Sequence, residues 1–235
     1  MMHKNIAIIK TGTTDSGLRK KVGDFEDWII GFSGLPSDAF ALLDLKTIPD
    51  WPLPQTFRAF IITGSHSNIT DNPPWLPDLA SYLRFAYGKK VAMLGICFGH
   101  QMLAHVLGGK VSDNPMGAEY GAVTVQVTEQ GRVNPLFKNL PSSFAVFMSH
   151  KQTVIRLPTN ARVLACSSLD KHAAFYLPPL VWGVQFHPEF TPEIMAWYLR
   201  QHYQINESEI NLHLSSPVQA TNIISEFIRL AIQRT

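Results

Sequence analysis

The sequence Gly-x-Cys-x-Gly at 95–99 places one thiol, that of Cys97, between two glycines and directly after an apolar run. The run at 91–96 is typical of a buried strand, and the residues after Cys97 have the spacing of an amphipathic helix. A sharp strand-to-helix turn presents a nucleophile above the edge of a sheet, and glycines on either side allow the turn. The helix N-terminus favours a thiolate, and the N–H group of Phe98 can stabilise an oxyanion. The pattern therefore predicts a nucleophilic cysteine, with a buried inert cysteine as its alternative.

A thiol nucleophile needs a proton carrier, and the carrier needs a group that orients it. The best candidates are His187 and Glu189 in the segment "VQFHPEF", which follows an apolar strand. Residues i and i+2 of an extended segment point the same way, so Glu189 can bind one ring nitrogen of His187 and leave the other facing the sulfur. For this segment taken alone, a buried histidine beside a surface glutamate is the alternative interpretation.

The two motifs together, "GICFGHQ" and about ninety residues later "GVQFHPE", resemble the class I glutamine amidotransferases, which have a Cys-His-Glu triad. The segments "IITGSHSNITDNPPW", "MGAEYGAVTVQVT" and "FMSHKQTV" also resemble parts of that family. The resemblance extends over nearly the whole chain. It is nearest to standalone amidotransferase proteins that are similar to GMP synthase.

The resemblance implies a role for each matching residue. Cys97 would form a γ-glutamyl thioester, His187 would act as general base and acid, and Glu189 would orient His187. The backbone N–H groups of Phe98 and Ser65 would form the oxyanion hole. The remaining matches would hold the substrate: Gly64, Gln101, Ser149, Lys151 and Gln152.

One loop departs from the family pattern. Family members usually have Gly-Gly-Pro where this chain has Gly64, Ser65 and His66. A backbone donor at Ser65 requires φ and ψ angles that do not demand glycine. We expect His66 to be an exposed loop residue, and a substrate contact is the alternative.

The elements that must position these residues follow an alternating pattern. Strand-like apolar runs lie at 5–10, 40–45, 57–64, 91–96 and 180–186, and helical patterns lie at 23–32, 73–90, 98–109, 192–203 and 217–234. This alternation predicts an α/β three-layer sandwich, flavodoxin-like, with a mostly parallel central sheet and helices on both faces. Between about 119 and 177, short strand-like runs separated by turns predict a smaller antiparallel region. We expect one amidotransferase domain over 1–235.

Composition excludes several classes of protein. Apolar residues make up 46% of the chain and charged residues 16%, which favours a sizeable core over disorder. The net charge is only +2 and the basic residues are scattered along the chain, so we expect no nucleic-acid partner. No apolar run is long enough to span a membrane, so we expect no membrane partner either. Two cysteines, Cys97 and Cys166, and no secretory signal favour a cytoplasmic protein. The histidines lack metal-ligand spacing and the segment at 11–17 lacks a complete phosphate-loop motif, so no metal or other cofactor is expected.

Three functions remain open at this point. The leading hypothesis is hydrolysis of the γ-amide of glutamine, with ammonia passed to a separate synthetase, because the chain has no ATP-binding motif. The alternative is a γ-glutamyl peptidase or hydrolase that acts alone on γ-glutamyl peptides or amines through the same thioester. The third is a non-enzymatic redox-sensing thiol, which would not depend on His187 or Glu189.

Overall fold

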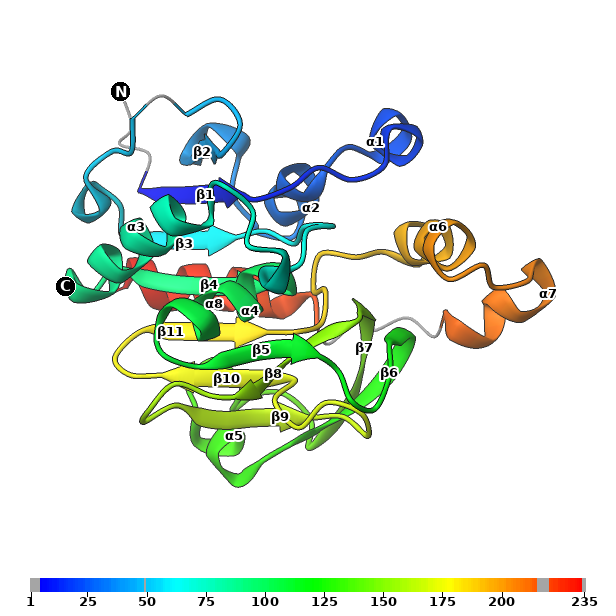
Figure 1. Ribbon diagram of the computed structural model, residues 1–235. Helices are drawn as coiled ribbons and strands as arrows, with labels where there is room; N and C mark the ends of the chain where they lie inside the picture. The colour runs from blue at the N-terminus through cyan, green and yellow to red at the C-terminus, as the bar shows by residue number, and fades with distance from the viewer. Residues whose placement is uncertain (1–4, 49, 215–219, 234–235) are drawn as a thin grey trace.

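A computed structural model describes residues 5–48, 50–214 and 220–233 of the chain. Within them, nine strands form one sheet in the order β2-β1-β3-β4-β11-β10-β9-β6-β7 (Figure 1). Neighbouring strands in the first part run parallel, namely β2 (Phe40–Asp44), β1 (Ile6–Lys10), β3 (Ala59–Ile62), β4 (Ala92–Ile96) and β11 (Val181–Val184). The antiparallel strands that extend it are β10 (Ala174–Leu177), β9 (Arg162–Cys166), β6 (Glu119–Val127) and β7 (Ser143–His150).

Helices cover both faces of this sheet. One face packs against α2 (Phe25–Gly31), α5 (Glu129–Val133) and α8 (Asn222–Ile232), and the other against α3 (Leu76–Gly88) and α4 (Phe98–Val106). Along β1, Ile6 and Ile8 belong to the first core, whereas Ala7 and Ile9 belong to the second. A strand buried on both faces must be apolar at every position, which is why its sequence reads as a continuous run. The predicted three-layer α/β fold is confirmed.

Several helices lie beyond the carboxyl ends of the parallel strands, where α1 (Ser16–Val22), α6 (Pro192–His202) and α7 (Glu207–Ile210) form one side of the molecule (Figure 1). The short 3-10 helices are η1 (Ser37–Ala39), η2 (Pro54–Thr56), η3 (Ile69–Asp71) and η4 (Asn211–His213). Within the described ranges, no helix is long and apolar enough to cross a membrane.

Three details differ from the sequence prediction. The strand β8 (Gln152–Arg156) leaves the large sheet and pairs antiparallel with β5 (Lys110–Asp113), which was not predicted. The Gln152 side chain donates hydrogen bonds to Thr70 of η3 and to Asp113 of β5, which join the start of β8 to these two elements. The helices α1, α5 and α7 were also not predicted, and α5 begins at Glu129, within a region predicted to contain only strands. The last helix begins at Asn222, and positions 217–219 and 234 of the predicted helix lie outside the described residues.

Candidate active site

Cys97 is the one residue between β4 and α4, at the carboxyl end of the parallel strands. Its φ of 50° and ψ of −102° are angles that side-chain-bearing residues rarely adopt, and its N–H donates to Val184 at 2.8 Å. A Cβ atom at Gly95 would overlap the carbonyl group of Gly99, and a Cβ atom at Gly99 would overlap the carbonyl oxygen of Ile62. Both glycines are therefore required for the sharp turn that presents the sulfur.

His187 approaches the same edge from the neighbouring strand. Because β4 and β11 are parallel and Val184 pairs with Ile96, the segments that follow them emerge side by side. Nδ1 of His187 lies 2.8 Å from Oε1 of Glu189, and the ring stacks on Phe190 with 3.9 Å between centroids. The Cys97 thiol and the same imidazole line one cavity. Since Nδ1 is engaged by the carboxylate, Nε2 is the nitrogen available to the sulfur.

The charges at this position favour a protonated imidazole. Burial by itself lowers the pKa of His187, but the Glu189 carboxylate and Cys97 outweigh burial and raise that pKa to about 10. An imidazole with such a pKa is an imidazolium at neutral pH.

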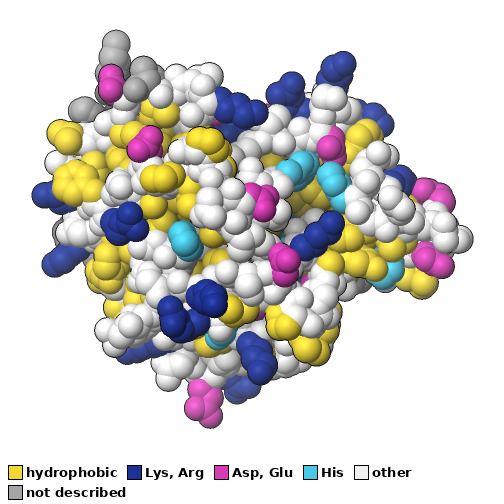
Figure 2. Space-filling model, viewed as in Figure 1, with side chains coloured by type: hydrophobic (Ala, Val, Ile, Leu, Met, Phe, Trp, Pro, Cys, Tyr) yellow, Lys and Arg dark blue, Asp and Glu magenta, His cyan; other side chains and the backbone are white. Residues whose placement is uncertain are grey.

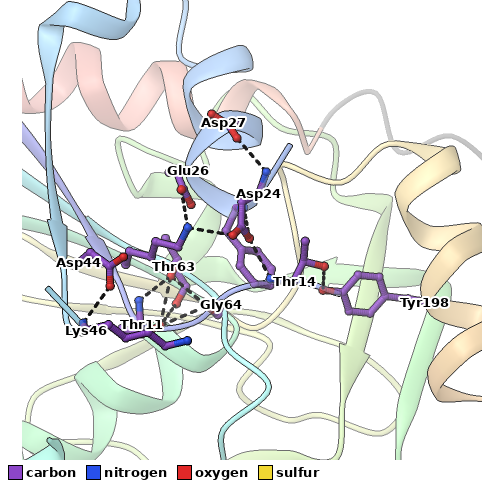
Figure 3. Close-up of polar contacts among 12 residues, drawn as sticks. Thr11, Thr14, Asp24, Glu26, Asp27, Asp44, Lys46, Thr63, Gly64 and Tyr198 are labelled. Carbon is purple, nitrogen blue, oxygen red and sulfur yellow. Dashed lines mark hydrogen bonds and ion pairs between the residues drawn. The ribbon is translucent and has the colours of Figure 1, made fainter. Parts of the chain in front are cut away.

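The loop after β3 forms the next wall. The Thr11 hydroxyl donates to the carbonyl oxygen of Gly64 at 3.1 Å (Figure 3). The Ser65 hydroxyl donates to the carbonyl oxygen of Thr11 at 3.1 Å. A Cβ atom at Gly64 would come within 3.1 Å of Cε1 of His187, so glycine leaves room for the imidazole. Ser65 is outside the set of described residues with positive φ, and its backbone therefore does not demand glycine.

A buried ion cluster fixes the segment that supports this loop (Figure 3). Lys10, at the end of β1, pairs with Asp24 at 2.8 Å and with Glu26. Burial lowers the pKa of Lys10, but the two carboxylates more than offset this and raise it. Asp24 also accepts from the N–H groups of Thr14 and Phe25, so it caps α2. The cluster ties α2 to the loop that begins at Thr11.

A cavity of about 240 Å³ opens in front of the thiol. Its lining includes most of the residues predicted from the sequence, namely Ser65, Cys97, Phe98, Gln101, Ser149, Lys151, Gln152 and His187. Gly64 and Glu189 do not line it: Gly64 lies against the His187 imidazole, and Glu189 is fully buried. This volume is near the small end of the range for small-molecule sites, which suits a substrate of amino-acid size.

Residues 49–203 match the sequence profile of the family Glutamine amidotransferase class-I. The chain belongs to this family. It is 30% identical to Gamma-glutamyl peptidase 5 of Arabidopsis thaliana, over 86% of this chain and 80% of that protein. It is also 46% identical to a glutamine-hydrolyzing GMP synthase of Aeropyrum pernix, over 48% of this chain. That match spans only 21% of the GMP synthase.

Solved structures of amidotransferases share the fold. A glutamine amidotransferase of Thermotoga maritima has a TM-score of 0.75 at 20% identity and covers 99% of this chain and 100% of its own. A glutamine amidotransferase of Methylobacillus flagellatus has a TM-score of 0.73 at 21% identity and covers 99% of this chain and 96% of its own.

Two glutamine residues that line the pocket of this amidotransferase, Gln101 and Gln152, hydrogen-bond to neighbouring segments. Nε2 of Gln101 donates to the carbonyl oxygen of Gln152 at 2.8 Å and to Oε1 of Gln185 at 3.0 Å. The side chain of Gln152 is committed to Thr70, Asp113 and the N–H group of Ile69. Gln152 can therefore face a substrate only with its main chain.

The β7–β8 turn completes the amidotransferase pocket. The carbonyl oxygen of Ser149 lies 3.8 Å from Sγ of Cys97, and the side chain of Lys151 is exposed. His150 is buried between these residues and pairs with Glu119, with 3.2 Å between Nε2 and Oε2. Glu119 is thus a buried partner of the turn.

Sequence reasoning missed the contribution of α6 to the amidotransferase site. Tyr198, His202 and Tyr203 line the cavity, and the Tyr203 hydroxyl hydrogen-bonds with that of Ser149 at 3.1 Å. Burial raises the pKa of Tyr203 to about 12, so its hydroxyl keeps its proton. Tyr198 and His202 are four residues apart and share one helix face, directly after the His-Pro-Glu segment, and this spacing was the available signal. His66 is exposed, as expected, and also lines the cavity.

Proposed function

We propose that this protein hydrolyses the γ-amide of glutamine to glutamate and ammonia, with Cys97 as nucleophile. The observation that carries the proposal is that one buried imidazole, His187, binds the Glu189 carboxylate and lines the same cavity as the Cys97 thiol. This is the arrangement of nucleophile, base and orienting group that covalent catalysis requires.

The reaction proceeds in two halves. The Cys97 thiolate attacks the amide carbon, and the imidazolium of His187 gives its proton to the nitrogen, which leaves as ammonia. The γ-glutamyl group is then a thioester on the sulfur. The neutral imidazole next takes a proton from water, the resulting hydroxide attacks the thioester, and glutamate leaves with the thiolate restored.

The walls of the cavity supply the other interactions. The first N–H groups of a helix have no partner within the helix, so that of Phe98 is available to the oxyanion, and we assign the second donor to Ser65. The amide nitrogen of Gln101 is engaged twice, which leaves its oxygen to accept from the substrate α-ammonium group. The main chain of Ser149, Lys151 and Gln152 would receive the other α-substituents.

We propose that the ammonia passes to a separate synthetase. The support comes from a relative in Methanococcus aeolicus, which is one of the subunits of a glutamine-hydrolyzing GMP synthase. The two proteins are 35% identical over 52% of this chain and 63% of that subunit. We also propose a cytoplasmic location, because both cysteines are free thiols, as is usual in a reducing compartment.

A second candidate function is cleavage of γ-glutamyl peptides by the protein alone. It is favoured by the match to Gamma-glutamyl peptidase 5, which spans 80% of that protein, whereas the match to the Aeropyrum GMP synthase spans 21%. The same thioester forms at Cys97, and only the leaving amine differs.

A substrate panel with purified protein tests both candidates. Glutamine and γ-glutamyl dipeptides are compared by kcat/KM, and the covalent adduct on Cys97 is followed by mass spectrometry after acid quenching. The amidotransferase proposal predicts that glutamine is the better substrate, and a preference of about tenfold or more for the dipeptides would establish the second candidate instead. Absence of turnover and of any adduct with every γ-glutamyl compound would overturn both.

A further inference from the structure

Three potential metal ligands meet at the rim of the active-site cavity. Asp15 precedes α1, His66 follows β3 and His202 ends α6, so the three come from distant parts of the chain. One ligand atom from each lies within 4.8 Å of those of the other two. Oδ2 of Asp15 is 2.8 Å from Nε2 of His202, and the two imidazole rings are 4.9 Å apart between centroids. Figure 2 shows histidine side chains gathered at the surface beside α6.

The fold itself does not require this convergence. Asp15 has the N-cap position of α1, but its side chain makes no capping hydrogen bond and turns instead to His202 and to Nε1 of Trp197 at 3.1 Å. The side chains of Asp15 and His202 are 32% and 33% exposed, and ion pairs in that setting contribute little to stability. Neither helix capping nor ion-pair stability therefore explains why the Asp15 side chain points to His202, and ligand binding is the remaining explanation that we pursue.

We propose that Asp15, His66 and His202 bind a divalent transition-metal ion of the zinc type at the rim of the active-site cavity. Two imidazoles and one carboxylate are a ligand set that zinc uses in proteins, with a water molecule or substrate group as the fourth ligand. Magnesium and calcium prefer all-oxygen sets. Ligand atoms around tetrahedral zinc are about 3.4 Å apart, given bonds of about 2.1 Å, so small side-chain rotations would complete the site.

Two of the ligands already have outer partners of the kind that orient metal ligands. Nε1 of Trp197 donates to Asp15, and the hydroxyl of Tyr198 lies 3.1 Å from Nε2 of His66. The latter contact leaves Nδ1 of His66 for the metal. Such outer hydrogen bonds fix the direction of a ligand before the ion arrives.

Metal binding would have a consequence for the reaction. His66 follows Ser65 directly, His202 lies on α6, and both residues line the cavity. An ion held by both would tie the loop after β3 to α6 beside the cavity. We expect the ion to restrict substrate access and slow turnover, and this consequence rests on the proposed function, whereas metal binding itself does not.

The binding test uses the full chain carrying Cys97→Ala, because the wild-type thiol and His187 would themselves attract zinc. Cobalt(II) is the probe, read by its visible absorption and by quenching of tryptophan fluorescence, since Trp197 contacts Asp15. We expect saturable binding of one ion that zinc displaces. His202→Ala and, separately, His66→Ala should each weaken binding by at least about tenfold.

The matched control is His105→Ala, which removes an exposed histidine from the last turn of α4. It should leave cobalt affinity unchanged. The proposal is overturned if no saturable binding of one ion occurs, or if His202→Ala and His66→Ala bind cobalt as tightly as His105→Ala does. One-to-one cobalt binding in a protein that turns over no γ-glutamyl compound would support the metal site and reject the proposed function.

Discussion

Nδ1 of His187 lies 2.8 Å from Oε1 of Glu189, and both side chains are buried beyond the end of β11. The carboxylate fixes which ring nitrogen carries a proton toward it, and so leaves Nε2 for the sulfur of Cys97. It also supplies the negative charge that overcomes the effect of burial on the pKa of His187. This pair therefore links the geometry of the site to its dependence on pH.

Glu189→Gln should lower the pH above which activity is lost. The imidazolium is present below its pKa of about 10, and loss of the carboxylate lowers that pKa, so the imidazolium and its proton are lost at a lower pH. We expect the alkaline limb of the kcat profile to move to lower pH, with kcat reduced by about 10² to 10⁴. An alkaline limb that stays in place would contradict the role of Glu189.

Cys97→Ala and His187→Ala should each reduce kcat for glutamine by at least about 10⁴, because nucleophile and proton carrier act as a unit. The measurement is glutamate release by purified protein. The matched control is Cys166→Ala, which removes the other free thiol, a half-buried one on β9. Equal losses in Cys97→Ala and Cys166→Ala would reject Cys97 as nucleophile.

Gly99→Ala should destabilise the protein and impair activity together. The added methyl group would overlap the carbonyl oxygen of Ile62, so β3 and α4 must separate, at a cost of about 1–3 kcal/mol. Gly88→Ala at the end of α3 is the control, because its methyl group would meet no atom within 4 Å. It should change stability by less than about 1 kcal/mol, in the stabilising direction. Urea denaturation of both variants gives the comparison, and equal stability would refute the packing argument.

Asp24→Ala should lower the free energy of unfolding by about 3 kcal/mol, because it removes a helix cap and one partner of the buried Lys10 ammonium group. Asp38→Ala, at an exposed carboxylate in η1, is the control and should change it by less than about 0.5 kcal/mol. Chemical denaturation monitored by circular dichroism measures both. Equal stability of the two variants would show that the buried ammonium group of Lys10 does not need the Asp24 carboxylate as a partner.

Much of the fold could be predicted because its signals are local. The continuous apolar runs of β1 and β4 reflect burial on both faces, and the glycine at position 95 reflects a contact with Gly99 within the same sharp turn. The alternation of such runs with helical patterns then predicts a parallel sheet with helices on both faces.

What could not be predicted depends on residues that are distant in the sequence. The segment of β8 has the pattern of any antiparallel strand, and its pairing with β5 and the contacts of Gln152 with Thr70 and Asp113 join residues that are far apart in the sequence. Asp24 is a polar residue whose burial depends on Lys10, 14 residues earlier. Asp15, His66 and His202, which meet at the cavity rim, have no recognisable spacing in the sequence because each comes from a different segment.

The central claim is that a γ-glutamyl group is carried by the sulfur of Cys97, and peptide mapping by mass spectrometry tests it most directly. The protein is mixed with glutamine, quenched with acid during turnover and digested. We predict one glutamyl group on the peptide that contains Cys97, and none in Cys97→Ala. Steady release of glutamate with no glutamyl group on that peptide, and undiminished release by Cys97→Ala, would contradict the account.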